Sequence, residues 1–294
     1  MSMHIALASC RNLPGWEVDD APFHLALEER GVRISHPVWD DPEVEWDLFD
    51  ACLIRTTWDY MERQDAYVSW ARRVSRLIPF FNPPEIIAWN TKKTYLRDLN
   101  ERGVAIAPTF FFEAEEQVDL SLLLKQTGWK RGFLKPVVGA TARETLRFDQ
   151  AELGKAQSHL DRLLQNEGMM FQPYLSAVEE VGELSAIFLG GRFSHAVRKI
   201  PQKGDYRVQD DFGASDLPVD LSREQRDLAE GIFDHAKAFT DAGDLLYGRV
   251  DWLTDDSGEL VLTELELVEP SLFFRHSKTA GVQLADSLCA MVGG

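Results

Sequence analysis

The most informative stretch of the sequence is residues 247–267, which read YGRVDWLTDDSGELVLTELEL. Turn-forming residues separate two runs of alternating side chains, so we expect a β-hairpin here. A two-residue turn would set Asp251 opposite Glu264, and it would also set Arg249 opposite Glu266. A four-residue turn would shift the pairing by two residues. Either register keeps these charged side chains on one face, because side chains alternate along a strand.

The two faces of this hairpin differ in chemistry. The opposite face is apolar and carries Val250, Trp252, Val261, Leu265 and Leu267. On the charged face, three carboxylates repel one another unless a cation or solvent compensates. Oxygen ligands without His or Cys favour magnesium or manganese over zinc, and magnesium commonly shares its coordination with substrate phosphates. A solvated acidic face is the alternative that the hairpin alone leaves open.

The crowding of these carboxylates also carries an expectation about stability. If they repel one another, replacing one of them by a neutral residue should relieve that repulsion. A Glu264→Gln protein is therefore expected to stay folded without metal and even to gain stability.

The composition places the chain among ordinary globular proteins. Its 294 residues allow two or three lobes around one site, with 45% hydrophobic and 27% charged residues. A net charge of −17 argues against nucleic acid or an anionic membrane as a partner. The three cysteines lack metal-ligand spacing, so we expect free thiols in a reducing compartment. Without a basic and apolar leader or a membrane-length apolar run, we expect a cytoplasmic protein.

The first 84 residues alternate short apolar strands with helices, which predicts an N-terminal parallel α/β domain. The pair Pro83-Pro84 marks its expected end. We expect a Gly- and Pro-containing loop after the first strand, strands at 4–8, 32–37 and 51–55, and helices at 20–30 and 65–77.

Residues 85–175 are expected to form a small central α/β lobe. Asn90 or Thr91 is the expected cap of a helix that runs to about residue 101. The remaining elements of this lobe are expected as strands at 109–112, 132–138 and 169–174, with helices at 120–126 and 151–165.

Residues 176–294 are expected to form a C-terminal α+β lobe that contains the hairpin described above. A Gly190-Gly191 turn should join long antiparallel strands at 183–189 and 192–200. A polar loop follows, and Ser222 with Gln225 predicts a capping box at the start of a helix.

Two lysines are candidates for holding an anion. Lys135 lies in an apolar strand, where a buried ammonium needs an anionic partner unless it snorkels to the strand end. The small residues of 139–143 allow backbone N–H groups to approach phosphate, and Arg143 adds charge. Lys93 opposes the dipole of its predicted helix unless an anion binds there. An ordinary surface pair with Lys92 is the alternative for Lys93.

Taken in order, these features resemble the ATP-grasp superfamily from Lys93 to Glu266. Shorter matches resemble the branch that contains prokaryotic glutathione-synthetase-like and O-ureido-D-serine cyclo-ligase-like enzymes. They lie at Gln172-Pro173-Tyr174, Gly182-Glu183, 193–197, 199–201 and 264–267. The resemblance implies an ATP-grasp fold, ATP as cofactor and Mg²⁺ or Mn²⁺ as the metal.

The resemblance also implies roles for individual residues. The ATP-binding set would be Lys93, Lys135, Gly139, Gln172, Tyr174, Leu175 and either Glu180 or Glu183 at the ribose. The metal ligands would be Asp251, Glu264 and Glu266, although many members have Asn at the position of Glu266. The catalytic cations would be Arg249, Lys199 and Arg143, and Ser271 would contact the substrate.

The acceptor substrate is expected beyond the strand at 51–55. Ligands gather at the carboxyl ends of parallel strands, and Arg55, Trp58 and Asp59 lie there. Arg55 could bind a carboxylate with two parallel hydrogen bonds. The alternative is a structural Arg55–Asp59 ion pair with Trp58 packed beneath it.

The implied activity is ATP-dependent ligation of a small amino-acid-like carboxylate to an amine or a related nucleophile, through an acyl phosphate and with release of ADP and phosphate. A kinase with a stable phosphorylated product and a non-catalytic nucleotide-binding module are the alternatives. The sequence leaves open which acid and nucleophile react and whether both belong to one molecule. Loops 139–143 and 202–214 are expected to close over the site. A homodimer is the base-rate expectation for the assembly.

Overall fold

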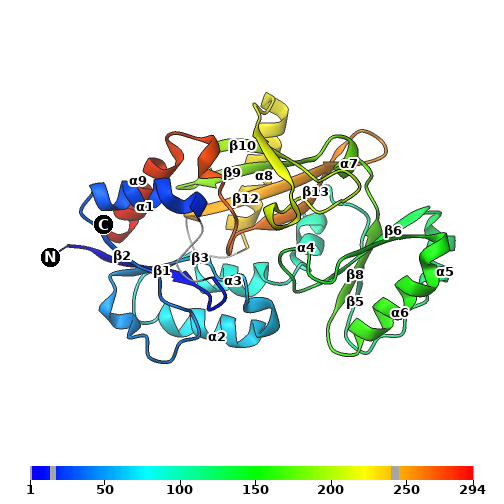
Figure 1. Ribbon diagram of the computed structural model, residues 1–294, viewed down its shortest axis with the longest axis horizontal. Coiled ribbons are helices and arrows are strands. Elements are labelled where there is room, and N and C mark those ends of the chain that lie inside the picture. The colour runs from blue at the N-terminus through cyan, green and yellow to red at the C-terminus, as the bar shows by residue number, and fades with distance from the viewer. Residues whose placement is uncertain (1, 14–17, 240–244, 294) are drawn as a thin grey trace.

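The computed structural model describes residues 2–13, 18–239 and 245–293. Within these residues the longer strands form three sheets, each in a different part of the molecule (Figure 1). The two chain ends lie on the same side of the molecule, beside the N-terminal sheet. No helix in the described part of the chain is long and apolar enough to cross a membrane.

The N-terminal sheet is parallel, with strand order β2-β1-β3-β4. Every residue of β3 is buried, as expected for a parallel strand that is covered on both faces. The predicted α/β layer is therefore confirmed, while part of the loop expected after β1 lies outside the described residues. Its elements are β1 (His4–Ser9), η1 (Val18–Asp20), α1 (Ala21–Glu29), β2 (Arg33–Ser35), η2 (Trp46–Leu48), β3 (Ala51–Thr56), η3 (Tyr60–Glu62), α2 (Gln64–Val74) and β4 (Phe80–Phe81).

The connection to the central lobe differs from the sequence expectation. Two helices, α3 (Pro84–Asn90) and α4 (Tyr95–Glu101), replace the single helix that was expected to begin at residue 90 or 91. Pro84 is tolerated in the first turn of α3, because its missing N–H has no intrahelical partner there. Asn90 is not a cap; its amide donates to Leu265 O and accepts from Leu267 N, both at 2.8 Å.

The central lobe is a four-stranded antiparallel sheet with order β5-β8-β6-β7. Strand β7 was not expected from the sequence, whereas the other three strands were. Buried apolar side chains of the helices and strands form the core of this lobe. Its elements are β5 (Phe110–Phe112), α5 (Leu120–Thr127), β6 (Arg131–Pro136), β7 (Leu146–Asp149), η4 (Gln150–Glu152), α6 (Leu153–Leu164) and β8 (Met169–Pro173). Helix α4 instead packs its buried side chains on the C-terminal sheet.

The C-terminal sheet has order β11-β10-β9-β12-β13, with antiparallel neighbours throughout. The Gly190-Gly191 turn is confirmed, since Leu189 pairs with Arg192 and both glycines have positive φ. The capping box of Ser222 and Gln225 is also present. The elements are α7 (Ala177–Glu180), β9 (Glu183–Leu189), β10 (Arg192–Ile200), η5 (Asp210–Phe212), β11 (Ser215–Pro218), α8 (Arg223–Lys237), β12 (Tyr247–Thr254), β13 (Leu260–Glu266), η6 (Phe274–His276) and α9 (Ala280–Gly293). Helix α9 packs beside α1, so segments near the two ends of the chain lie in contact (Figure 1).

The β12–β13 hairpin has the expected register at its charged residues, although its turn is longer than expected and a β-bulge is present. Asp251 pairs with Glu264 and Arg249 pairs with Glu266, as a two-residue turn would predict. The turn itself is longer, because Gly258 N donates to Asp255 O at 3.0 Å. A bulge where the register shifts, beyond Asp251, restores the pairing at the charged face.

This bulge also changes which apolar residues face the site. Beyond it, Trp252 pairs with Leu262, and Leu253 pairs with Val261. Leu262 therefore joins Trp252 in the core on the back of the sheet, whereas Val261 packs with Leu253 in a separate cluster. The prediction that Val261 lies on the apolar back face was wrong, because a bulge reverses the alternation of side chains.

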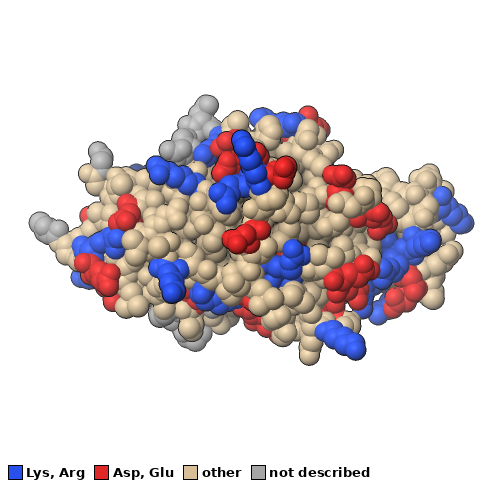
Figure 2. Space-filling view, turned by 90° about the horizontal axis from the view of Figure 1, so that it is seen from above, with Lys and Arg blue, Asp and Glu red and all other residues tan. Residues whose placement is uncertain are grey.

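Charged side chains are mixed on the surface seen from above. Acidic and basic residues alternate there and do not gather into one continuous basic surface (Figure 2).

Candidate active site

A cavity of about 280 Å³ opens where the three sheets approach one another. Fifteen residues predicted from the sequence to bind ATP, metal or substrate or to act in catalysis line it. They are Trp58, Lys93, Lys135, Gly139, Arg143, Gln172, Tyr174, Leu175, Glu183, Lys199, Arg249, Asp251, Glu264, Glu266 and Ser271. Three other predicted residues, Arg55, Asp59 and Glu180, do not line it.

Asp251 lies at the centre of a buried ion-pair network on β12. Arg249 donates to it at 2.8 Å, Lys199 approaches it at 3.1 Å, and the Ser185 hydroxyl donates to it at 2.6 Å. Burial alone would raise the pKa of Asp251, but Arg249 and Lys199 lower it below the ordinary value. Arg249 also pairs with Glu266, and Lys199 pairs with Glu183. The network joins strands β9, β10, β12 and β13.

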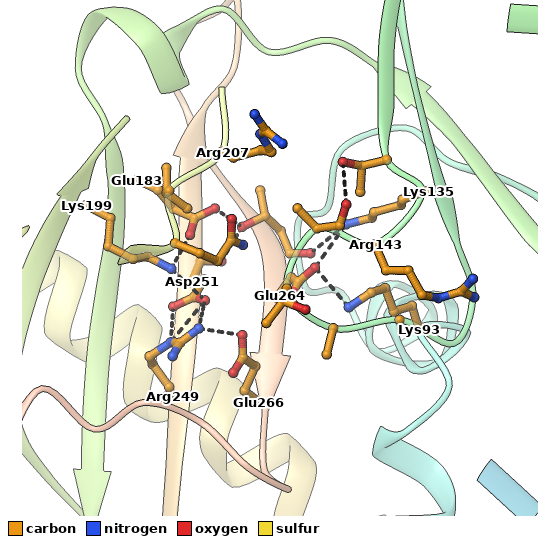
Figure 3. A pocket seen from close by; sticks show the side chains of 18 of the residues that line it. Lys93, Lys135, Arg143, Glu183, Lys199, Arg207, Arg249, Asp251, Glu264 and Glu266 are labelled. Carbon is orange, nitrogen blue, oxygen red and sulfur yellow. Dashed lines mark hydrogen bonds and ion pairs between the residues drawn. The ribbon is translucent and has the colours of Figure 1, made fainter. Parts of the chain in front are cut away.

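Glu264 forms ion pairs with two lysines that come from different parts of the chain (Figure 3). Its Oε1 lies 2.9 Å from Lys93 Nζ and 3.5 Å from Lys135 Nζ. Lys93 precedes α4, where its backbone N–H donates to Val137 O at 2.8 Å. Although burial opposes ionisation, Lys93 and Lys135 lower the pKa of Glu264 below its usual range. Burial in turn lowers the pKa of Lys135, with Lys93 adding to the effect.

The remaining carboxylates of the cavity are harder to ionise. Burial raises the pKa of Glu266 to about 7, with Asp251 and Glu264 adding to the effect and Arg249 opposing it. Burial raises the pKa of Glu269 to about 8, and Glu266 adds to the effect. A cation bound between these acidic groups would favour their ionised forms.

The donor set fits a magnesium ion, although it is not arranged as a finished metal site. Among the described residues, no group of three or more His, Cys, Asp or Glu side chains is placed to hold a metal ion. Asp251, Glu264 and Glu266 instead face Lys and Arg side chains. They offer only oxygen donors from one face of a hairpin, which is the chemistry that magnesium prefers. The same lysines and arginine carry the positive charge that phosphate groups need.

The opposite end of the cavity is apolar and aromatic. Tyr174, Val178 and Val208 form a buried cluster with Phe133, Tyr206 and Leu253 packed against it. Five of these, Phe133, Val178, Tyr206, Val208 and Leu253, were not named as site residues from the sequence. Tyr206 and Val208 belong to the polar loop 202–214 that was expected to close over the site, and the regular alternation of side chains along β12 places Leu253 on the same face as Asp251. A flat heterocycle such as adenine fits an apolar surface of this kind.

Both loops that were expected to cover the site line the cavity. The second loop contacts residues that follow the first: the Tyr206 hydroxyl lies 3.0 Å from Thr145 Oγ1, and Arg147 of β7 donates to Gly204 O at 3.0 Å. Arg143 pairs with Glu167 and points away from the acidic cluster (Figure 3). Its guanidinium is therefore engaged by its own lobe.

Arg55 is buried, with 3% of its surface exposed, and it binds Asp20 with two parallel hydrogen bonds of 2.8 Å. Arg55 does not line the cavity, and the Arg55–Asp59 ion pair considered from the sequence is absent, because Asp20 occupies the guanidinium. Asp59 instead accepts a hydrogen bond from the Trp39 indole at 2.7 Å. Residue spacing did not identify Asp20 as the partner, because the two residues come from different segments of the α/β layer.

Residues 267–271, which follow β13, form a segment in which every backbone carbonyl oxygen accepts a hydrogen bond from a side chain. We call it the clamped segment. The side chains of Asn82, Tyr247, Trp58, Arg55 and Arg249 donate in turn to the carbonyl oxygens of residues 267, 268, 269, 270 and 271, at 2.8, 2.7, 3.0, 3.3 and 3.0 Å. Glu269 and Ser271 of this segment line the cavity. Trp58 and Arg55 therefore support the cavity wall through the backbone.

Comparison with known proteins gives relatives along the whole chain. Residues 5–82 match the family described as "D-cycloserine synthetase DcsG, N-terminal domain". The cycloserine biosynthesis protein DcsG of Streptomyces lavendulae is 28% identical over 284 residues, which cover 92% of this chain and 93% of that protein. The crystal structure of D-cycloserine synthetase DcsG is 26% identical, with a TM-score of 0.89 and coverage of 98% of this chain and 99% of that one.

More distant structures share the fold. A D-alanine–D-alanine ligase from Bacillus anthracis, complexed with ATP, is 14% identical with a TM-score of 0.70, and 99% of this chain and 97% of that one are covered. The ATP-grasp ligase PsnB, complexed with precursor, Mg and ADP, is 16% identical with a TM-score of 0.64 and covers 99% and 98% of the two chains. The ATP-grasp fold expected from the sequence is confirmed.

Proposed function

Because the chain is an ATP-grasp ligase, we propose that it activates the carboxylate of a small amino acid as an acyl phosphate and closes a ring onto a nitrogen of the same molecule. The ligase activity follows from the fold and the relatives, whereas the ring closure is the proposal. It is supported by the likeness to D-cycloserine synthetase, which extends over 98% of the chain. Cycloserine is a five-membered ring that contains an N–O bond.

The observation that carries the activation step of the proposal is the sharing of Glu264 by Lys93 and Lys135, next to the Arg249–Asp251 pair. Phosphate oxygens would take the two lysines, and magnesium would take Glu264, Asp251 and Glu266. Bound magnesium supplies positive charge that offsets the charge of the transferred phosphoryl group. The apolar cluster with Tyr174 and Leu253 would hold the adenine.

The reaction then needs two displacements. A carboxylate oxygen of the substrate attacks the terminal phosphorus of ATP, and ADP leaves. The substrate nitrogen next attacks the activated carbonyl carbon, the bond from that carbon to the phosphate oxygen breaks, and the nitrogen loses a proton. Arg249 and Lys199 would stabilise the transferred phosphoryl group, and much of the acceleration would come from positioning. The two loops that line the cavity would exclude water from the acyl phosphate.

The test uses β-aminooxyalanine, the open-chain amino acid whose ring closure gives cycloserine, in both D and L forms. We expect ADP and phosphate in equal amounts, together with a cyclic product seen by mass spectrometry. A stable phosphorylated product with no free phosphate would instead indicate a kinase and would overturn the proposal.

A trapping experiment separates activation from ring closure. Hydroxylamine intercepts acyl phosphates, so a simple amino acid with ATP and hydroxylamine should give ADP, phosphate and a hydroxamate. Hydroxamate formation with amino acids but no ring from either form of β-aminooxyalanine would retain the ligase and reject the cyclisation. Absence of ADP with every carboxylate tested would reject both.

Three finer expectations belong to the same proposal. Manganese is expected to replace magnesium, because both accept oxygen ligands in octahedral geometry. The three cysteines are unpaired, in keeping with action in the reducing cytoplasm. The proposed lobes of 1–84, 85–175 and 176–294 and a homodimeric assembly can be checked by limited proteolysis and light scattering.

A further inference from the structure

We propose that Glu269, presented by the clamped segment, is the counter-ion for a protonated amino group of the substrate. Within the amino-acid class of the proposed function, Glu269 would select for an ammonium group beside the reacting carboxylate. This inference rests on the proposed function, since it names a group of the substrate that the same cavity would bind.

Glu269 is the partly buried carboxylate of the cavity that forms no ion pair with Lys or Arg among the described residues, although the charge of Lys93 lies near enough to lower its pKa. The other partly or fully buried acidic groups of the cavity are each paired with Lys or Arg: Asp19, Glu183, Asp251, Glu264 and Glu266. Asp211 also lacks an ion pair among these residues, but it is exposed, so water can solvate it. A carboxylate that is partly removed from water and forms no ion pair is complementary to a positively charged ligand group.

The backbone on which Glu269 sits is fixed before any ligand arrives. The Trp58 indole donates to Glu269 O at 3.0 Å, and the neighbouring carbonyl groups of Val268 and Pro270 are held by Tyr247 and Arg55. Preorganisation of this kind lowers the entropy cost of binding, because the recognition group does not have to be ordered by the ligand.

The surroundings of the Glu269 side chain also suit an ammonium group. Tyr60, which is 4% exposed, contacts the carboxylate through its hydroxyl, and Trp58 lines the same part of the cavity. The Tyr60 hydroxyl opposes the rise in the pKa of Glu269 that burial causes, and a bound ammonium group would favour the ionised carboxylate further. Aromatic side chains beside an ammonium group add a favourable interaction.

The clamped segment connects this acidic group to the cation assigned to phosphoryl transfer. Arg249 donates to Ser271 O at 3.0 Å while it pairs with Asp251 and Glu266. Glu269 is part of the clamped segment, and Arg249 is hydrogen-bonded to the same segment at Ser271 O. An α-amino acid, whose ammonium and carboxylate groups are attached to one carbon atom, fits a site with one acidic and one basic recognition group so placed.

The test compares matched substrates that differ only in the amino group. The pairs are β-aminooxyalanine with 3-aminooxypropionate, assayed directly, and alanine with lactate, assayed with hydroxylamine as the trap. We expect the wild-type enzyme to prefer the amino member in kcat/KM by about 10- to 100-fold, the range for a charge-assisted hydrogen bond. In Glu269→Gln this preference should disappear, mainly through a higher KM for the amino member. Activity on the desamino member should stay near that of the wild type.

Two further variants make the result specific. Glu269→Asp keeps the charge and should retain part of the preference, which a purely structural role would not predict. Glu259→Gln changes an exposed carboxylate in the β12–β13 turn and should behave like the wild type. Binding of a non-hydrolysable ATP analogue should be unchanged in all three variants.

The inference is overturned if Glu269→Gln keeps the preference or if the wild-type enzyme has none. Failure of the inference alone would appear as ADP formation that does not depend on the amino group. Failure of the proposed function would appear as no ADP with any member of either pair, and the inference would fall with it. A Glu269→Gln protein that does not fold leaves the decision to the wild-type preference and to Glu269→Asp.

Discussion

Arg55 Nη2 donates a hydrogen bond of 3.3 Å to the carbonyl oxygen of Pro270 and so connects the first sheet to the clamped segment of the active site. The same guanidinium binds Asp20 through two hydrogen bonds of 2.8 Å. Both charged groups are almost completely buried. Arg55 therefore supports the cavity wall, and Asp20, which precedes α1, holds Arg55 in position.

The main effect of replacing Arg55 by methionine should therefore be a lower free energy of unfolding and not the loss of a substrate contact. Removing one partner of a buried ion pair leaves the other charge without compensation, at a cost of about 3–5 kcal/mol. Urea unfolding of Arg55→Met should show this loss, and the double variant Arg55→Met/Asp20→Leu should be more stable than Arg55→Met alone. If Arg55→Met unfolds like the wild type but loses acceptor affinity, the arginine contacts substrate after all.

His24 gives the N-terminal layer a pH-dependent stability. It is 6% exposed, and burial lowers its pKa to about 4, with His36 and Arg55 adding to the effect and Asp20 opposing it. The folded state therefore binds fewer protons than the unfolded state between pH about 6.5 and 4. Stability should fall as the pH drops through this window, by no more than about 3 kcal/mol from this group.

The measurement is the free energy of unfolding of the wild type and of His24→Gln at several pH values. The variant should be less stable near neutral pH because of lost packing, but its stability should depend less steeply on pH below 6.5. Equal slopes for the two proteins would show that His24 does not carry the dependence.

The sequence predicted much of the charged part of the site, because that part depends on local periodicity. Alternation along residues 247–267 was sufficient to place Arg249, Asp251, Glu264 and Glu266 on one face. The Gly190-Gly191 turn and the Ser222 capping box were predicted for the same reason, since each depends on residues close in sequence. Residue spacing alone does not reveal a β-bulge, so the prediction that Val261 lies on the apolar back face was wrong.

Contacts between distant segments could not be obtained in this way. Asp20 and Arg55 both follow strands of the same parallel sheet, but the sequence does not show that their side chains meet. The clamped segment depends on donors from three other parts of the chain, and its own sequence, Leu-Val-Glu-Pro-Ser, has no motif that marks it. The start of α3 was missed because Pro83-Pro84 was interpreted as a boundary and not as a helix start.

Lys135→Ala should weaken ATP binding while the protein stays folded. Lys135 is 5% exposed, and its ammonium group is poorly satisfied, at 3.4 Å from Thr263 O and 3.5 Å from Glu264. Loss of a charge-assisted contact to phosphate corresponds to about 1.5–3 kcal/mol, or roughly a 10- to 100-fold higher Kd. Calorimetry with a non-hydrolysable ATP analogue measures this, with Lys155→Ala, an exposed lysine of α6, as the control. Equal affinity in folded Lys135→Ala would remove this lysine from the nucleotide site.

Glu264→Gln should lose magnesium-dependent turnover, but the structure reverses the expected effect on stability. The sequence suggested that a neutral residue would relieve repulsion among the carboxylates. In the structure Glu264 instead compensates Lys93 and Lys135, at 2.9 and 3.5 Å, so its removal leaves two largely buried ammonium groups facing each other.

We therefore expect ligand-free Glu264→Gln to be less stable than the wild type by about 1–3 kcal/mol, below the cost for a fully buried pair because Glu264 is 28% exposed. The pKa of Glu264 is lowered in the folded state, so its contribution is present above the ordinary carboxylate pKa and is lost as the pH falls. The stability difference between the two proteins should consequently shrink in acid. Unfolding experiments at neutral and acidic pH measure this difference, with the exposed Glu259→Gln as the matched control. A Glu264→Gln protein that is more stable than the wild type at neutral pH would show that repulsion among the carboxylates outweighs their pairing with the lysines.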